Sequence, residues 1–252
     1  RGAAHQDFVH ALAFHPSGNL LASAGFREVK LWQRQAAVQR RAIPFDPAAT
    51  AAAISPDGKL LAIALADNGI RIIQTADGQA VRNIPGHTAA VTGLQFTADN
   101  TKLVSVSKDK TARMWNVADG AAAGSLETPG EITALLLNTE GNRLYTANAD
   151  NIVRGWNVPF EDPKPAEGDK PAEPVKPGVQ MQGHGGAITA IALVPAQPQI
   201  ATSSLDGNWR LFDINNGNQV RAGNHGAPVL GLSVRNDGQA LATAGGNAAK
   251  LW

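Results

Sequence analysis

Short apolar segments recur along this chain of 252 residues, and their patterning is typical of β-strands. Segments such as VHALAF, VTGLQF and ITAIALV either alternate apolar and polar residues or form short apolar runs. Turn-forming sequences such as HPSGN, SPDGK and RNDGQ separate them. No segment carries a sustained helical period. The pattern therefore predicts an all-β protein built from short strands.

The strand and turn pattern repeats six times, with a period near 41 residues. In each repeat the third strand ends in a large apolar residue, and these ends are 41, 42, 41, 56 and 40 residues apart. Each repeat predicts four strands, but the sixth stops at its third. We expect the last unit to lack its outer strand within this chain. The third strands end at Trp32, Ile73, Trp115, Trp156, Phe212 and Trp252.

Both faces of each predicted sheet are apolar. The residues one and three positions before the terminal aromatic or isoleucine are apolar, as Leu31 and Val29 are before Trp32. Side chains alternate along a strand, so Trp32 itself points to the opposite face. A sheet with two apolar faces needs cover on both, and stacking like sheets around an axis supplies it. The sequence predicts a single β-propeller domain over residues 1–252.

The long fourth interval holds an inserted loop over residues 159–179, with six prolines. Proline removes backbone donors, and the mixed charges of this segment stay hydrated, so we expect an extended excursion without a packed core. The loop could be a docking arm, but a tolerated surface loop is the favoured interpretation.

Composition excludes several classes of function. The chain has no cysteine, which excludes disulfides, thiolate zinc sites and covalent haem attachment. Lys and Arg number 22 against 21 Asp and Glu, and a net charge of +1 gives no electrostatic footprint for nucleic acid or anionic lipid. No apolar run approaches the roughly 20 residues of a membrane helix. We expect no nucleic-acid partner and no membrane insertion.

Polar residues also recur at fixed spacing. A histidine precedes a hydroxyl residue by 18 positions in four repeats: His5 and Ser23, His87 and Ser105, His184 and Thr202, His225 and Thr243. An aspartate lies six positions before the end of the third strand in repeats two to five, at Asp67, Asp109, Asp150 and Asp206.

These residues resemble those of the WD40 (WD-repeat) family, in which a Gly-His pair opens a unit and a Trp-Asp pair closes its third strand. The third repeat matches best. The resemblance implies a β-propeller in which a loop His, a strand hydroxyl, a turn Asp and the Trp form a hydrogen-bonded set. The sets it assigns are His87, Ser105, Asp109 and Trp115; His184, Thr202 and Asp206; His5, Ser23 and Trp32; Thr146, Asp150 and Trp156; and His225, Thr243 and Trp252.

Three repeats depart from the family pattern. Repeat two has Ile63 and Ile73 at the hydroxyl and Trp positions, repeat four has no His, and repeat five ends in Phe212. We expect those sheets to be held more by packing than by the polar set.

The histidines could also suggest a metal site, and His184, Thr202 and Asp206 a hydrolytic triad. The four equivalent histidines belong to four different units, so a shared ion is not expected. The trio recurs at His87, Ser105 and Asp109, and the resemblance gives it the role of fixing a loop to the sheet. We predict no catalytic residue, no metal site and no cofactor.

A basic residue stands two positions before the end of every third strand. Six such residues could form a positive ring, but we expect their stems to pack between sheets and their charged ends to reach the turn carboxylates. They are Lys30, Arg71, Arg113, Arg154, Arg210 and Lys250.

The resemblance implies that partners dock on the rim around the central channel. The positions three and five after the loop His, and the one before the turn Asp, face outward there. Those positions nominate Phe8, His10, Lys108, Leu205, Pro228 and Leu230, of which Phe8, Leu205, Pro228 and Leu230 would form an apolar patch.

We predict a non-catalytic scaffold for protein–protein interaction, with another protein or a fused domain as partner and no small-molecule substrate. Parts of repeats one and four, ALAFHPSGNLLASAGFREVKLW and LYTANADNIVRGWNVP, also resemble bacterial WD40 regions fused to c-type cytochrome-like domains. That resemblance implies an extracytoplasmic redox protein. An enzyme that uses the channel and an architectural assembly subunit are further alternatives. The open sixth unit predicts that a longer polypeptide or a partner completes it.

Overall fold

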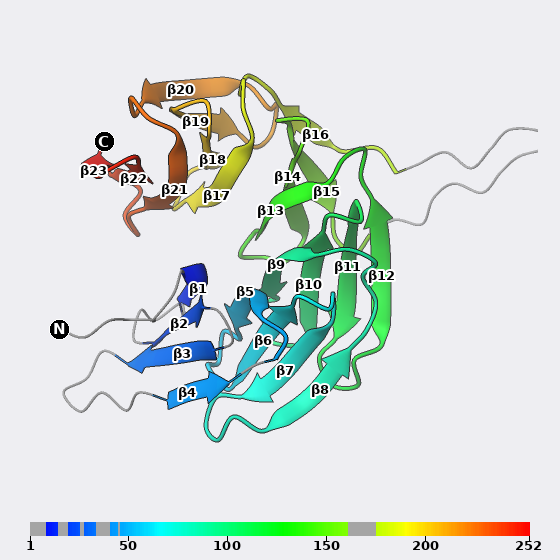
Figure 1. Cartoon of the computed structure of the whole chain (residues 1–252). Coiled ribbons are helices and arrows are strands. Elements are labelled where there is room, and N and C mark those ends of the chain that lie inside the picture. Colours follow the sequence, from blue (N-terminus) through cyan, green and yellow to red (C-terminus); the bar gives the residue numbers. More distant parts are fainter. Residues whose placement is uncertain (1–8, 15–19, 26–27, 34–40, 45, 161–174) are drawn as a thin grey trace, which may run out of the picture. The chain divides into compact units, whose positions relative to one another are not determined.

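The computed structural model describes residues 9–14, 20–25, 28–33, 41–44, 46–160 and 175–252. In this part of the chain every regular element is a β-strand, so the predicted all-β fold is confirmed. The strands form six antiparallel sheets, which we call blades 1 to 6 in chain order (Figure 1). Blades 1 to 3 belong to one compact unit, residues 1–125, and blades 4 to 6 to a second, residues 126–252.

The first unit contains three four-stranded sheets whose strands pair in chain order. Blade 1 comprises β1 (Val9–Phe14), β2 (Leu20–Gly25), β3 (Glu28–Gln33) and β4 (Arg41–Pro44); blade 2 comprises β5 (Ala49–Ile54), β6 (Leu60–Leu65), β7 (Ile70–Gln74) and β8 (Ala80–Ile84); blade 3 comprises β9 (Val91–Phe96), β10 (Lys102–Ser107), β11 (Thr111–Asn116) and β12 (Ala122–Glu127).

The second unit contains two four-stranded sheets and one of three strands. Blade 4 comprises β13 (Ile132–Leu137), β14 (Arg143–Asn148), β15 (Val153–Asn157) and β16 (Val179–Met181); blade 5 comprises β17 (Ile188–Val194), β18 (Gln199–Ser204), β19 (Asn208–Asp213) and β20 (Gln219–Asn224); blade 6 comprises β21 (Val229–Val234), β22 (Leu241–Gly245) and β23 (Ala248–Leu251).

Neighbouring blades within each unit bury their apolar faces against each other, as the two-faced pattern predicts. In blade 2, Ile63 and Ile73 pack in one cluster with Leu31 of blade 1. The opposite face of blade 2 presents Ile72 to a second cluster that contains Trp115 of blade 3. Separate clusters likewise join blades 4 and 5 and blades 5 and 6. Burial of both sheet faces is the main stabilising contribution of this arrangement.

The inserted loop leaves and rejoins blade 4 between its third and fourth strands. Residues 161–174 of the predicted 159–179 insert lie outside the described residues. The predicted boundary is wrong at its C-terminal end, because Val179 begins β16 and pairs with Gly155 of β15. A methyl group on Gly155 would lie 2.6 Å from the Val179 side chain, which explains the need for glycine where this strand docks.

Blade 6 has three strands among the described residues, as the pattern predicts. Its third strand, β23, is exposed along its length, and Leu251 retains 75% of its surface. In blades 1 to 5 the third strand pairs with a fourth.

Candidate functional site

Blade 3 contains a continuous set of side-chain hydrogen bonds that joins its entry loop to its sheet. Trp115 Nε1 on β11 donates to Ser105 Oγ on β10 at 2.8 Å. Ser105 Oγ lies 2.7 Å from His87 Nε2, and His87 Nδ1 lies 2.8 Å from Asp109 Oδ2. The carboxylate also accepts the Thr88 backbone N–H. The structure therefore brings together all four residues that the family resemblance assigns to this blade.

Burial and hydrogen bonding set the charge states of this set. Burial lowers the pKa of His87, and its hydrogen bond to Asp109 offsets this only in part. Burial raises the pKa of Asp109, but hydrogen bonds from Thr111, Thr88 and His87 outweigh that effect and lower it to about 2. A neutral imidazole thus donates to an ionised carboxylate.

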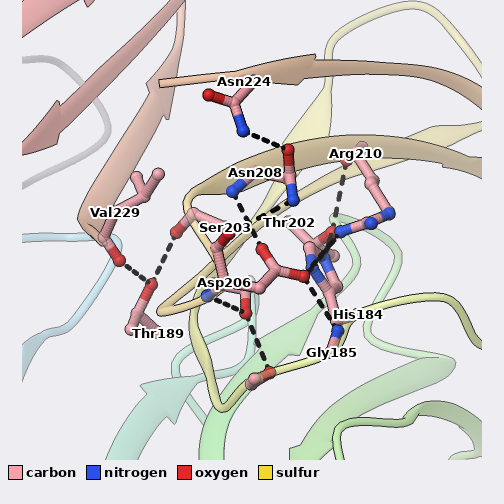
Figure 2. A network of polar contacts seen from close by, with 12 residues as sticks. His184, Gly185, Thr189, Thr202, Ser203, Asp206, Asn208, Arg210, Asn224 and Val229 are labelled. Carbon is pink, nitrogen blue, oxygen red and sulfur yellow. Dashed lines mark hydrogen bonds and ion pairs between the residues drawn. The ribbon is translucent and has the colours of Figure 1, made fainter. Parts of the chain in front are cut away.

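Blade 5 repeats the contacts of the loop His, the strand hydroxyl and the turn Asp (Figure 2). Its third strand has Phe212 where blade 3 has Trp115. His184 Nε2 lies 2.8 Å from Thr202 Oγ1, and His184 Nδ1 lies 3.1 Å from Asp206 Oδ2. The Phe212 side chain has no N–H to donate, and the Thr202 hydroxyl donates to the Arg210 carbonyl oxygen at 3.3 Å. Arg210 Nη1 pairs with Asp206 Oδ2 at 2.9 Å, which replaces part of the missing polar contact.

The set in blade 4 differs from the prediction at one residue. Trp156 Nε1 donates to Thr146 Oγ1 at 2.9 Å, as the family resemblance implies. Asp150 does not join them: Arg154 holds both of its carboxylate oxygens, at 3.0 and 2.6 Å. The Thr146 hydroxyl donates instead to Asn148 Oδ1. This blade has no loop His, and Arg154 contacts both oxygens of the carboxylate, whereas in blade 5 Asp206 pairs with His184 and with Arg210.

Blades 1 and 6 carry partial sets. Trp32 Nε1 donates to Ser23 Oγ at 2.7 Å, while His5 lies outside the described residues. In blade 6 Trp252 Nε1 donates to Thr243 Oγ1 at 2.9 Å, and His225 Nδ1 lies 2.8 Å from the same oxygen. His225 Nε2 faces the Gly245 carbonyl oxygen at 3.0 Å. This turn has no aspartate, and the imidazole ring of His225 instead hydrogen-bonds to a backbone carbonyl.

The six basic residues before the strand ends do not share one kind of partner. Arg154 and Arg210 reach turn carboxylates, as predicted. Arg71 donates from Nε to Asn83 Oδ1, Arg113 to Thr111 Oγ1, and Lys250 to the His225 carbonyl oxygen. The described contacts of these five side chains are thus made with their own or the adjoining repeat.

The buried position of the sets decides against the triad interpretation. The side chain of His184 is 1% exposed, and Thr202 is fully buried, so a substrate carbonyl cannot approach this hydroxyl. Within the described ranges, no group of three or more His, Asp or Glu side chains lies close enough to hold a metal ion. The sets join loops to sheets and stabilise the blades.

A second series of polar contacts was missed by the sequence analysis. In each first strand one residue is skipped by the pairing with the second strand, which marks a β-bulge. Three bulged threonines donate to the first carbonyl of the next blade's first strand: Thr50 to Val91, Thr133 to Ile188 and Thr189 to Val229, at 2.9, 3.1 and 2.8 Å. The bulged residues are His10, Thr50, Thr92, Thr133, Thr189 and Leu230.

Comparison with known proteins agrees with this geometry. A family model described as "WD domain, G-beta repeat" matches residues 3–33, 78–116 and 175–213. The chain carries WD40 repeats. The matched segments contain the third-strand ends Trp32, Trp115 and Phe212, so the hydrogen-bonded sets described for blades 1, 3 and 5 lie within matched WD40 segments.

Several curated proteins resemble this WD40 chain. It is 27% identical over 193 residues to Periodic tryptophan protein 2 of Arabidopsis thaliana, covering 75% of this chain and 20% of that protein. It is 38% identical over 96 residues to an uncharacterized WD repeat-containing protein of Synechocystis, covering 37% and 27%. It is 26% identical over 235 residues to a guanine nucleotide-binding protein subunit beta of Oryza sativa, covering 86% and 58%. The chain thus spans less than two thirds of each of these relatives.

The residues nominated for the WD40 rim are exposed where the structure describes their side chains. Leu205 follows β18 and is 45% exposed, and Leu230 on β21 is 66% exposed. Pro228 and Lys108 are exposed as well. Phe8 and the His10 side chain lie outside the described residues. No helix in the described part is long and apolar enough to cross a lipid bilayer.

Proposed function

We propose that this chain is a non-catalytic WD40 scaffold that binds another protein through the rim of blades 5 and 6. The proposal rests chiefly on Leu230. At the same bulged position, Thr50, Thr133 and Thr189 use their hydroxyls to hold the next blade. Leu230 has no hydroxyl and exposes two thirds of its surface, so its side chain serves no such link.

Two further apolar residues adjoin Leu230 at the same end of the blades. The His225 N–H donates to the Gly207 carbonyl oxygen at 2.7 Å, which ties the turn after Leu205 to the loop that carries Pro228. Register places Leu205 beside the start of β17 and Leu230 at the start of β21, so both lie at the ends where first strands begin. Leu205, Pro228 and Leu230, which we call the rim patch, offer an apolar contact surface.

The relatives named above support the scaffold role by analogy. A guanine nucleotide-binding protein subunit beta is by name one subunit of an assembly, and the chain also resembles a U3 small nucleolar RNA-associated protein 15 homolog of Xenopus tropicalis. The redox alternative rests on the sequence resemblance in repeats one and four, and none of these relatives is described as a cytochrome.

Affinity purification with paired variants tests the proposal. The affinity-tagged chain is expressed in the cells that naturally produce it, as wild type, as Leu205→Glu/Leu230→Glu and as a Val220→Glu control. The proteins that co-purify with each of the three are then quantified. Val220 is an exposed apolar residue on the outer strand β20, so its replacement controls for added charge. We expect a partner that wild type and control retain and the double variant loses at least about tenfold. Equal recovery by all three would refute the rim patch.

A further inference from the structure

A groove on the first unit lies beside the turn between β6 and β7 and the loop that enters blade 3. Its volume is about 530 Å³. The apolar floor is formed by Leu65, Ile70 and Ile84, each 2% exposed. Asp67, Asn68, Arg71 and Asn83 supply polar groups, and Pro85 and Gly86 form part of the wall. The rim patch belongs to blades 5 and 6, so this groove is a separate feature.

Asp67 differs from the aspartates at the same position in other blades. Asp109 accepts His87, Thr88 N–H and the Thr111 hydroxyl, and Asp206 accepts His184 and Arg210. Asp150 is paired with Arg154. Asp67 is exposed, and the contact described for it is a single backbone hydrogen bond, from Gly69 N–H to Oδ1 at 2.9 Å.

One local replacement bears on this difference. Gly69 stands where blade 3 has Thr111, so the hydroxyl that binds Asp109 has no counterpart in blade 2. Arg71 stands where Arg154 and Arg210 pair with their carboxylates, and its Nε donates to Asn83 Oδ1 at 3.2 Å. The Asp67 carboxylate therefore lies at the edge of the groove with one described hydrogen bond.

We propose that this groove binds an extended peptide segment of a protein partner by one lysine or arginine side chain seated at Asp67. The aliphatic stem of such a side chain matches the floor of Leu65, Ile70 and Ile84, and its cationic end complements the carboxylate. Arg71 adds a positive charge to the same groove, so a single basic residue with apolar neighbours fits better than a basic run. This site is additional to the rim patch and does not depend on it.

Peptide selection tests the proposal on the full chain. A phage library of random hexapeptides is selected on wild type and counter-selected on Asp67→Lys, and the recovered peptides are synthesised for fluorescence anisotropy. We expect recovered sequences with one Lys or Arg beside apolar residues. For these peptides Asp67→Asn should raise Kd about five- to tenfold, and added salt should weaken binding.

Asp77→Asn is the matched control. Asp77 lies in the same blade, is exposed, and accepts one backbone N–H, from Gln79 at 2.9 Å. In both variants the amide oxygen can still accept that hydrogen bond, so both should fold with the wild-type melting temperature. Asp77→Asn should leave Kd within about twofold.

Three outcomes would overturn the proposal: no enrichment of Lys or Arg after counter-selection, enrichment of acidic peptides, or equal Kd for Asp67→Asn and wild type. If Asp67→Lys fails to fold, selection on wild type followed by the Asp67→Asn comparison gives the same decision. The Leu205→Glu/Leu230→Glu variant should bind these peptides normally. Its behaviour with cellular partners therefore tests the rim patch separately.

Discussion

Blades 2 and 3 have the same strand order and equivalent register, but different forces hold their second and third strands. In blade 3, Ser105 pairs across from Arg113 and its hydroxyl joins Trp115 to His87. In blade 2, Ile63 occupies the place of Ser105, pairs across from Arg71 and is fully buried. One blade is fastened by a hydrogen-bonded set and the other by apolar packing.

The difference teaches what the polar set adds to the fold. The sheet forms equally well without it, because the apolar faces of blade 2 are buried against both neighbours. What changes is the turn carboxylate. In blade 3, Asp109 is occupied by the entry loop, whereas in blade 2 Asp67 is left at the edge of an open groove. The polar set stabilises a blade, and it also engages the turn carboxylate in hydrogen bonds, so that this carboxylate is not available to a ligand.

The largest effect should follow removal of the indole in blade 3. Trp115 is 4% exposed, packs in the cluster between blades 2 and 3, and donates to Ser105. Trp115→Ala should lower the free energy of unfolding by about 4 kcal/mol, measured by urea denaturation with circular dichroism. Trp252→Ala, at the exposed edge of blade 6, is the control and should cost less. A loss below about 2 kcal/mol for Trp115→Ala would contradict the view that this residue joins the two blades.

A smaller loss should follow when a blade 3 residue is placed in blade 2. Ile63→Ser buries a hydroxyl in an apolar cluster and removes a fully buried side chain, so it should cost about 3 kcal/mol by the same measurement. Ile63→Val keeps the apolar character and should cost about 1 kcal/mol. Equal losses for the two variants would contradict the view that apolar packing at Ile63 holds blade 2.

The smallest effect should be a dependence of stability on pH that blade 3 has and blade 2 lacks. Burial holds the pKa of His87 below its ordinary value of 6.5, so below that pH the unfolded chain binds more protons than the folded one. The His87 contribution is complete above pH 6.5 and is lost as pH falls below it. The melting temperature should therefore drop between pH 7.5 and 5.5, and His87→Asn should show a shallower drop. An identical slope in the variant would exclude His87 as the titrating group.

The sequence predicted features that repeat locally. The third-strand ends, the 18-residue spacing from His to hydroxyl and the two apolar faces each recur in several repeats, and the family resemblance assigned the spaced polar residues to common hydrogen-bonded sets. Asp150 shows the limit of that reasoning. Its position matches Asp109, but blade 4 has no loop His and the carboxylate pairs with Arg154, and the choice of partner is not visible in spacing.

The bulged threonines show a different limit. Thr50, Thr92, Thr133 and Thr189 recur at intervals of 42, 41 and 56 residues, which are the intervals of the repeat itself. Threonine is common in strands, so its recurrence did not indicate a hydrogen bond between blades. Its partner is a backbone carbonyl of the next blade, which no residue type marks. Alignment of the repeats at the bulge would have singled out the threonines and the two residues that differ from them, His10 and Leu230.

The links between first strands also have a direction. Thr133 of blade 4 donates to the Ile188 carbonyl oxygen of blade 5, and Thr189 of blade 5 donates to the Val229 carbonyl oxygen of blade 6. Each hydroxyl therefore gains its acceptor only after a later segment has been translated. As the ribosome releases the chain from its N-terminus, blades 3, 5 and 6 each bring the carbonyl that accepts the threonine hydroxyl of the blade before. This direction of hydrogen bonding favours assembly in the order of synthesis, because the earlier blade already carries the hydroxyl that binds the next one.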